Sequence, residues 1–82
     1  MESKQWAVQV YISEDRDDTV ARAVLLRDGM RISGVGRARR NPGDRPIPEI
    51  GDELAASRAL ADLADRLRTV AADDIAQLAG PA

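Results

Sequence analysis

The sequence predicts an α+β fold in which a three-stranded antiparallel meander precedes a long helix and a short C-terminal helix. Apolar and polar residues alternate with a period of two in the first half of the chain, which is typical of half-buried strands. In the second half, apolar residues recur with the helical period of 3.6. Three prolines and a glycine within residues 41–48 separate these halves and predict an extended loop. The chain of 82 residues is long enough for one domain, residues 1–82.

The first strand is predicted at residues 4–12, where the side chains alternate strictly. The side expected to face the core carries Trp6, Val8, Val10 and Ile12. A polar turn follows, and the second strand is expected at residues 19–27. The pair Asp28-Gly29 predicts a two-residue hairpin turn, because glycine readily adopts the positive φ that such turns require. The third strand is therefore predicted at residues 30–40.

Two glycines of the third strand, Gly34 and Gly36, fall on its inward side with Ile32 and Ala38. Glycine weakens a strand unless another segment must approach the backbone closely, and we expect the helix to be that segment. The same glycines have the spacing of a dinucleotide-binding loop. However, Arg39 replaces the third glycine of that motif, and the segment continues as a strand instead of opening a helix. We therefore interpret the glycines as packing residues.

The long helix is predicted at residues 49–71, and a short last helix, capped by Asp73, at residues 73–79. Asp52 and Glu53 lie in the first turn of the long helix, where negative charge suits the positive end of the helix dipole. The apolar stripe expected to face the sheet consists of Ile50, Leu54, Leu60, Leu63, Ala64, Leu67, Val70 and Ala71.

The composition predicts a homodimer. The chain has no Cys and no His, so disulfides and the usual metal staples are absent, and its fourteen alanines bury little area per residue. One helix covers only one side of a three-stranded sheet, and the outer strands remain unpaired. The other side keeps Val20, Val24, Leu26 and Val35. We expect a second copy to complete the structure, either with its helix or by joining the two sheets edge to edge.

The residue inventory argues against an enzyme. Without His or Cys there is no ordinary general base and no thiol nucleophile for the serines to work with. We expect no catalytic residue, no cofactor and no metal site. No apolar run approaches the length of a membrane span, and the N-terminus has no signal-peptide pattern, so we expect a cytoplasmic protein without membrane contact.

Positive charge is concentrated in residues 27–45, which contain six arginines and two aspartates, although the whole chain has a net charge of −2. A guanidinium can bind phosphate through two parallel hydrogen bonds. This segment has no aromatic residue on which bases could stack, so contact with structured RNA through its shape is the expected mode. The candidate RNA-binding residues are Arg37, Arg39, Arg40 and Arg45. Alternatively, these arginines pair with acidic residues of a second subunit, namely Glu49, Asp52 or Glu53.

The segment GVGRARRNPGDRPIPEIGDELAASRALADLA, preceded by WAVQVYI, resembles a family of short actinobacterial proteins that is classed as a domain of unknown function. The family includes a mycobacterial protein induced in hypoxia and dormancy. The resemblance covers nearly the whole chain. It implies a β-β-β-α subunit similar to double-stranded-RNA-binding domains (dsRBD-like), an intimate homodimer, and a likeness to ribosome hibernation promoting factors. It implies no catalytic or ligand-binding residue.

We therefore expect a non-enzymatic, dimeric binding protein, associated with stress or dormancy, that contacts the ribosome or other structured RNA. The alternative is a protein–protein interaction module without a nucleic-acid role. That module would act through an open edge of the sheet or through the acidic face of the helix, formed by Asp52, Glu53, Asp62 and Asp65.

Overall fold

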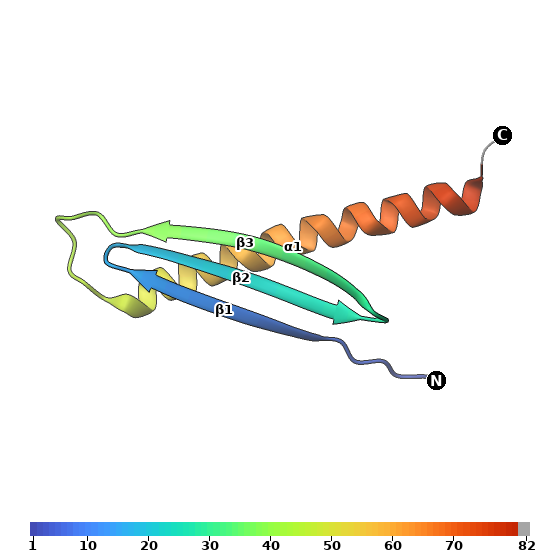
Figure 1. Ribbon diagram of the computed structural model, residues 1–82, viewed down its shortest axis with the longest axis horizontal. Coiled ribbons are helices and arrows are strands. Elements are labelled where there is room, and N and C mark those ends of the chain that lie inside the picture. Colours follow the sequence, from blue (N-terminus) through green and yellow to red (C-terminus); the bar gives the residue numbers. More distant parts are fainter. Residues whose placement is uncertain (81–82) are drawn as a thin grey trace.

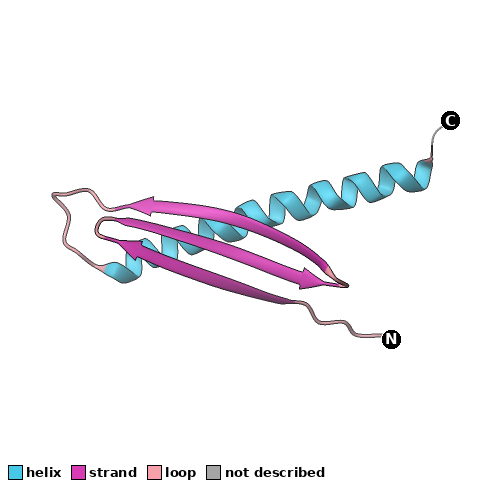
Figure 2. Ribbon diagram, in the orientation of Figure 1, coloured by secondary structure: helices cyan, strands magenta, loops and turns pink. Residues whose placement is uncertain are grey.

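The computed structural model describes residues 1–80 and has three strands followed by one helix. The strands are β1 (Ala7–Asp15), β2 (Asp18–Arg27) and β3 (Met30–Arg39), and the helix is α1 (Pro48–Ala79). The sheet is antiparallel with the order β1-β2-β3 (Figures 1 and 2). The predicted α+β meander with a following helix is confirmed.

Both hairpins turn within two residues. Arg27 pairs with Met30, so Asp28 and Gly29 form the predicted turn, and both have positive φ. The first turn is tighter than predicted, because Asp15 pairs with Asp18 and Arg16 takes a φ of 57°. Strand pairing uses backbone groups, so the polar end of β1 pairs as well as its apolar middle. This is why β1 extends to Asp15 instead of ending at residue 12.

The prediction of a separate C-terminal helix at residues 73–79 was wrong, because α1 continues without a break to Ala79. The expected break contains only alanine and aspartate, neither of which interrupts a helix as proline does. Extending an existing helix also costs less than nucleating a new one. The helix ends at Gly80, whose positive φ lets its N–H reach the carbonyl oxygens of Ala76 and Gln77 at 3.2 and 3.1 Å.

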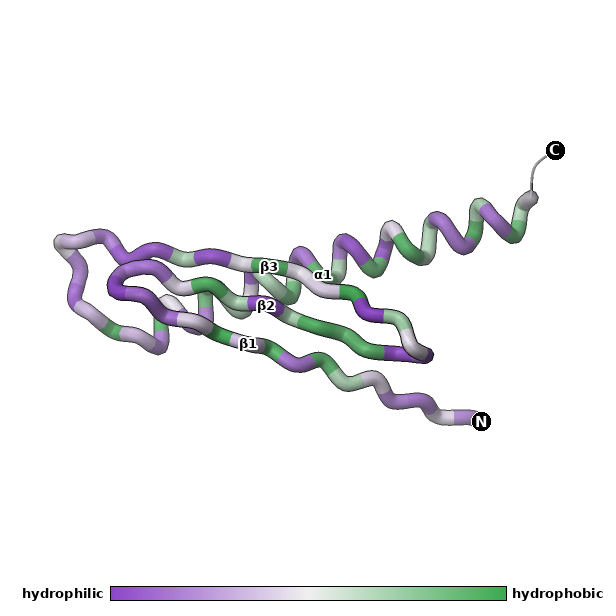
Figure 3. The backbone as a smooth tube through the Cα atoms, viewed as in Figure 1, coloured by the Kyte–Doolittle hydropathy of each residue, from purple (hydrophilic) through white to green (hydrophobic). Residues whose placement is uncertain are grey.

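The helix crosses one face of the sheet diagonally and covers β2 and β3 far more than β1 (Figure 1). Its C-terminal turns project beyond the β2–β3 turn, where Ile75 and Leu78 are exposed. Figure 3 shows the most continuous hydrophobic segment along β2, beneath the helix. Within residues 1–80, no helix is both long enough and apolar enough to span a bilayer.

The core is built from small residues. Gly34 and Gly36 face α1, and a Cβ atom at either position would come well within 3.0 Å of the helix backbone near Ala55, Ala59 or Leu63. The predicted role of these glycines, clearing space for the helix, is confirmed. The buried cluster consists of Ala21, Ala23, Leu25, Ile32, Ala38, Ala55, Ala59 and Leu63, with Leu67 and Val70 against it.

The predicted apolar stripe of the helix was wrong in its N-terminal part. Ile50, Leu54 and Leu60 are about half exposed, because the close approach leaves room only for alanine beneath the helix axis. On β1, the side chains expected in the core lie on the helix side of the sheet, beyond the reach of α1. Val8, Val10 and Ile12 remain half exposed, as does Trp6, which precedes β1.

This packing predicts that Gly36→Ala destabilises the protein. The added methyl meets helix backbone instead of a flexible side chain, so we expect the free energy of unfolding to fall by about 3 kcal/mol. Gly43→Ala is the matched control, because its Cβ meets nothing within 4 Å, and its effect should stay within about 0.5 kcal/mol. Urea unfolding followed by circular dichroism measures both values. Equal stability of the two variants would contradict the close approach.

Candidate functional site

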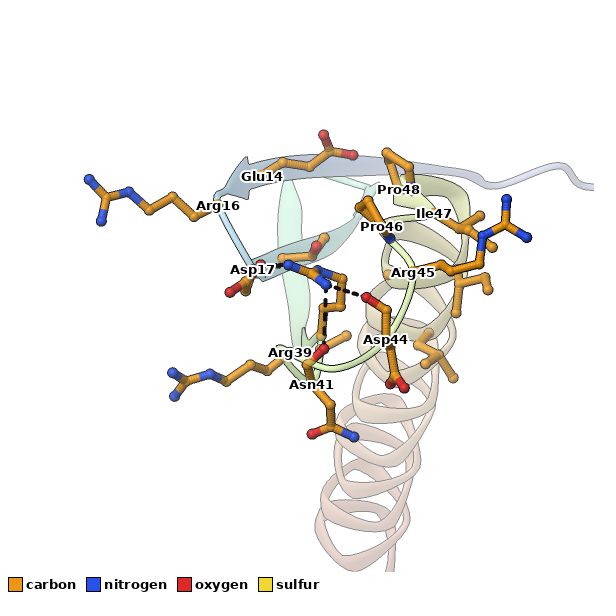
Figure 4. Close-up of a pocket in the computed structure, with 16 residues that line it drawn as sticks. Glu14, Arg16, Asp17, Arg39, Asn41, Asp44, Arg45, Pro46, Ile47 and Pro48 are labelled. Carbon is orange, nitrogen blue, oxygen red and sulfur yellow. Dashed lines mark hydrogen bonds and ion pairs between the residues drawn. The ribbon is translucent and has the colours of Figure 1, made fainter.

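The crossover loop between β3 and α1 is organised by Arg40. Its Nε and Nη2 donate to Asp17 Oδ1 at 3.1 and 2.8 Å, and its Nη1 donates to the carbonyl oxygens of Asn41 and Asp44. The backbone N–H of Arg40 also donates to the Asp17 carbonyl at 2.8 Å. Asp17, Asn41 and Asp44, which supply these acceptors, are labelled in Figure 4. We therefore assign Arg40, one of the four predicted RNA-binding residues, a structural role in holding the loop.

The other three candidates do not form one cluster. Arg37 and Arg39 lie on β3 and point away from α1, whereas Arg45 lies in the crossover loop. In Figure 4, the side chains of Arg45 and Arg39 point to opposite sides of the loop. A single flat ligand surface therefore includes Arg37 and Arg39 but not Arg45.

A pocket of about 570 Å³ opens between the β1–β2 turn, the end of β3, the crossover loop and the first turns of α1. Its apolar wall includes Ile47, Ile50 and Leu54. Charges of both signs surround it, since Arg45 and Glu14 also line it (Figure 4). This mixture selects no single ligand charge. In the described part of the chain, no group of three or more acidic side chains is placed to hold a metal ion.

The face of the sheet opposite α1 carries the main concentration of positive charge. The strand registers place Arg22 beside Val35, and Arg37 beside Val20, all on this face. We define the open sheet face by its charged residues and its tyrosine. They are Tyr11, Asp15, Asp18, Arg22, Arg31, Arg37 and Arg39. Four arginines against two aspartates give this face a net charge of +2, whereas the whole chain has −2.

The candidate RNA-binding residues named from the sequence did not include Arg22, Arg31 or Tyr11, which lie on this face. The Arg22 guanidinium carbon lies 5.9 Å from the centre of the Tyr11 ring, which is within the range of a cation–π contact. Residues 27–45 themselves have no aromatic residue, as the sequence shows, and the strand register brings Tyr11 to the same face as their arginines. Counting outward from the Asp28-Gly29 turn would have placed Arg22 opposite Val35 and so on the same side as Arg37.

The two edges of the sheet differ. On the outer edge of β3, Asp62 accepts the N–H of Val35 at 2.8 Å, and Arg58 donates to the carbonyl of Arg37 at 2.7 Å. The hydrogen bond from Val35, followed by one from Arg66, lowers the pKa of Asp62 below 3.8. Within residues 1–80, no side chain forms such a hydrogen bond with the backbone of β1, and every residue of β1 is exposed. One edge is therefore closed by the helix, and the other is bare.

The predicted acidic helix face is divided by these contacts. Asp62 is committed to β3 and Arg66, and Asp65 lies 3.7 Å from Arg68. Asp52 lies on the flank toward β1, beside Glu14. A hydrogen bond to Asp52, then the negative charge of Asp52, raises the pKa of Glu14 above 4.5. Oδ1 of Asp52 is shielded and has no hydrogen-bond partner in the described structure.

Comparisons with known proteins identify relatives over nearly the whole chain. The sequence model of the Rv2632c-like family matches residues 4–82. The uncharacterized protein Mb1767 of Mycobacterium bovis is 46% identical over 72 residues, which are 88% of this chain and 77% of that protein. The uncharacterized protein Rv2632c of Mycobacterium tuberculosis is 44% identical over the same shares. The crystal structure of Rv2632c aligns with a TM-score of 0.91 and 39% identity, covering 100% of this chain and 98% of that one.

The carboxyl pair predicts that Glu14→Gln stabilises the protein at neutral pH. The raised pKa means that ionised Glu14 disfavours the folded state, so its contribution to stability is full below pH 4.5 and is lost as the pH rises through the folded-state pKa. Glutamine removes that loss, and it can donate to Asp52. The melting temperature of the variant should exceed that of the parent at neutral pH, and the two should converge below pH 4.5. Glu53→Gln controls for the loss of one charge, and a difference independent of pH would contradict this account.

Proposed function

The chain belongs to the Rv2632c-like family, and we propose that it is a non-enzymatic, homodimeric protein whose open sheet face binds the phosphates of structured RNA. The observation that supports this proposal is the charge of that face, +2 in a chain of −2. Strands hold its arginines at fixed spacing, and a guanidinium pairs with phosphate oxygens through two hydrogen bonds.

The distribution of charge also orients an approaching polyanion. Outside the open sheet face the chain has more acidic than basic residues, and seven acids lie on α1 against three arginines. Phosphates are therefore repelled from the helix side and attracted to the sheet side. Such steering allows specific contact in a protein whose net charge is negative.

Tyr11 supports RNA as the polyanion. It is half exposed at the centre of β1 and lies beside Arg22, so an aromatic ring and a cation face solvent together. Sheets that bind RNA stack bases on aromatic rings of this kind. Because this face has one tyrosine, we expect contacts with the RNA backbone and shape to dominate over reading of the base sequence.

The proposal revises the predicted site residue by residue. Arg37 and Arg39 remain, Arg22 and Arg31 are added, and Arg40 is excluded because its donors are already engaged. Arg45 lies outside this face and would make a second contact from the crossover loop.

The ribosome is the first structured RNA to test, because the family resemblance implies a likeness to hibernation factors. Under this proposal, the protein would meet ribosomes in the cytoplasm during stress or dormancy. Co-sedimentation with ribosomes that weakens steeply with salt is the expected behaviour. Co-sedimentation unaffected by salt would argue against phosphate contact.

A second candidate function, a protein-interaction module, is favoured by the bare edge of β1 and the half-exposed side chains beside it. Such an edge accepts an extended segment of another chain. Capture of a specific protein that survives nuclease treatment would favour this function over RNA binding.

We predict that Arg37→Ala/Arg39→Ala weakens binding to an A-form RNA duplex about tenfold at low salt. Each arginine that contacts phosphate should also reduce the slope of log affinity against log salt by about 1. Fluorescence anisotropy across a salt series measures both quantities. The matched control is Arg66→Ala/Arg68→Ala, which removes the same charge from the exposed part of α1.

Equal loss in the two double variants would show only a general charge effect and would contradict the assignment of the open sheet face. Circular dichroism of each variant establishes that the fold is retained.

A further inference from the structure

Two aromatic side chains are exposed in this molecule, and each lies beside an arginine. The Arg27 guanidinium carbon is 4.6 Å from the centre of the Trp6 ring, and the Arg22 guanidinium carbon is 5.9 Å from the centre of the Tyr11 ring. Trp6 is 47% exposed and Tyr11 is 50% exposed, but they lie on opposite sides of the sheet. A ligand that meets one ring therefore does not meet the other.

The surroundings of the two rings differ. Trp6 and Arg27 lie on the helix side, where the acids of α1 repel phosphate. The Nε of Arg27 is shielded and has no hydrogen-bond partner within residues 1–80, so this guanidinium is poorly accessible to phosphate. Tyr11 and Arg22 lie on the open sheet face, whose net charge is +2. Only the Tyr11 ring therefore combines an exposed aromatic surface with a field that attracts nucleic acid.

The Tyr11 ring is held in place by its hydroxyl group. That hydroxyl donates a hydrogen bond to Oε1 of Gln9, two residues earlier on the same face of β1. With the hydroxyl bound at one end and the Arg22 guanidinium beside the ring, Tyr11 has less rotational freedom than an unsupported surface tyrosine. An aromatic ring that is already oriented binds a base at a smaller entropic cost.

We propose that Tyr11, Gln9 and Arg22 form a subsite for one unpaired nucleotide of the bound RNA. The base of that nucleotide stacks on the Tyr11 ring, and its phosphate contacts Arg22. This inference rests on the proposed function, because it gives the open sheet face a preference for RNA duplexes that carry a bulged nucleotide. A base inside a duplex is stacked on its neighbours and cannot use the ring, whereas a bulged base is free to do so.

The strand register gives the RNA backbone a path away from the ring. Arg22 pairs with Val35, and Arg37 lies two residues beyond Val35 on the same face of β3. Arg22 and Arg37 are therefore diagonal neighbours, which lie about 7–8 Å apart in an antiparallel sheet. Arg39 continues the series along β3. Phosphates on one side of the bulge can follow these three arginines while the bulged base remains on Tyr11.

Gln9 determines which base fits best. Its Oε1 accepts from Tyr11, so its two amide N–H groups remain available to an incoming base. Uracil and guanine present carbonyl oxygens to such donors, whereas adenine presents none. The two-way contact that glutamine makes with adenine also needs Oε1 as an acceptor, and the Tyr11 hydroxyl competes for that atom. We therefore expect a bulged uridine to be preferred to a bulged adenosine.

Three RNA hairpins that differ at one nucleotide test the subsite. One is fully paired, one carries a single bulged uridine, and one carries a single bulged adenosine. In fluorescence anisotropy, the protein should bind the uridine-bulged hairpin about fivefold more tightly than the paired hairpin, because one base then stacks on an aromatic side chain. The adenosine-bulged hairpin should bind about threefold more weakly than the uridine-bulged hairpin, as expected for one exposed hydrogen bond.

Variants at the two aromatic positions assign the effect to one ring. Tyr11→Leu should abolish the advantage of the bulge and leave the affinity for the paired hairpin unchanged. Trp6→Leu is the matched control, because it removes a similarly exposed ring beside an arginine from the other side of the sheet, and it should keep the advantage. Tyr11→Phe should keep the stacking but release Oε1 of Gln9, so the preference for uridine over adenosine should disappear. Circular dichroism of each variant establishes that the fold is retained.

Equal affinity of the parent protein for the paired and the uridine-bulged hairpins would overturn the subsite, and this comparison needs no variant. An equal loss of the bulge advantage in Trp6→Leu and Tyr11→Leu would also overturn it. A preference for uridine that survives in Tyr11→Phe would overturn the role assigned to Gln9.

The same titrations separate the subsite from the proposed function. If the bulge gives no advantage but the paired hairpin binds with a steep salt dependence that Arg37→Ala/Arg39→Ala reduces, the proposed function stands and only the subsite fails. If the bulge advantage requires Tyr11 but the double arginine variant binds as tightly as the parent, the subsite stands and the phosphate assignment fails. Absence of salt-dependent binding to all three hairpins would overturn both.

Discussion

The contact between the backbone of α1 and the two glycines of β3 determines the rest of the architecture. Because Gly34 and Gly36 have no side chains, the helix lies directly on β3, with Ala55 and Ala59 at the contact. This position brings Asp62 and Arg58 to the outer edge of β3. It also draws the helix away from β1, whose core-facing side chains remain half exposed. A larger residue in β3 would move the helix and change both edges.

The same contact separates the charges of the molecule. With α1 fixed on one side, its acids lie there, and the outward positions of β2 and β3 carry arginine on the other side. Arg40 is the exception, because its charge is used to close the crossover loop onto Asp17. The local excess of arginine in the sequence therefore has two structural outcomes. Some arginines form an exposed basic face of the sheet, whereas Arg40 forms an ion pair that holds the crossover loop.

The sequence predicted those features that depend on local pattern and missed those that depend on contacts between distant residues. Alternation and the Asp28-Gly29 pair were sufficient for the meander. The clamp on Arg40 was missed because Asp17 lies 23 positions earlier and meets it only when both hairpins close. The stripe of α1 was assigned to leucines, because periodicity favours large residues, whereas the facing glycines select Ala55 and Ala59. Tyr11 and Arg22 join the basic face only through strand register.

The bare edge of the sheet ends in a cluster of acidic side chains. Glu14, one residue before the end of β1, lies beside Asp52, and Glu49 is near enough to contribute to the raised pKa of Glu14. Such a cluster is unfavourable when its carboxylates are ionised, and a proton on Glu14 relieves it. The stability of this end of the sheet therefore depends on pH, because Glu14 keeps its proton to a higher pH than an ordinary carboxyl group.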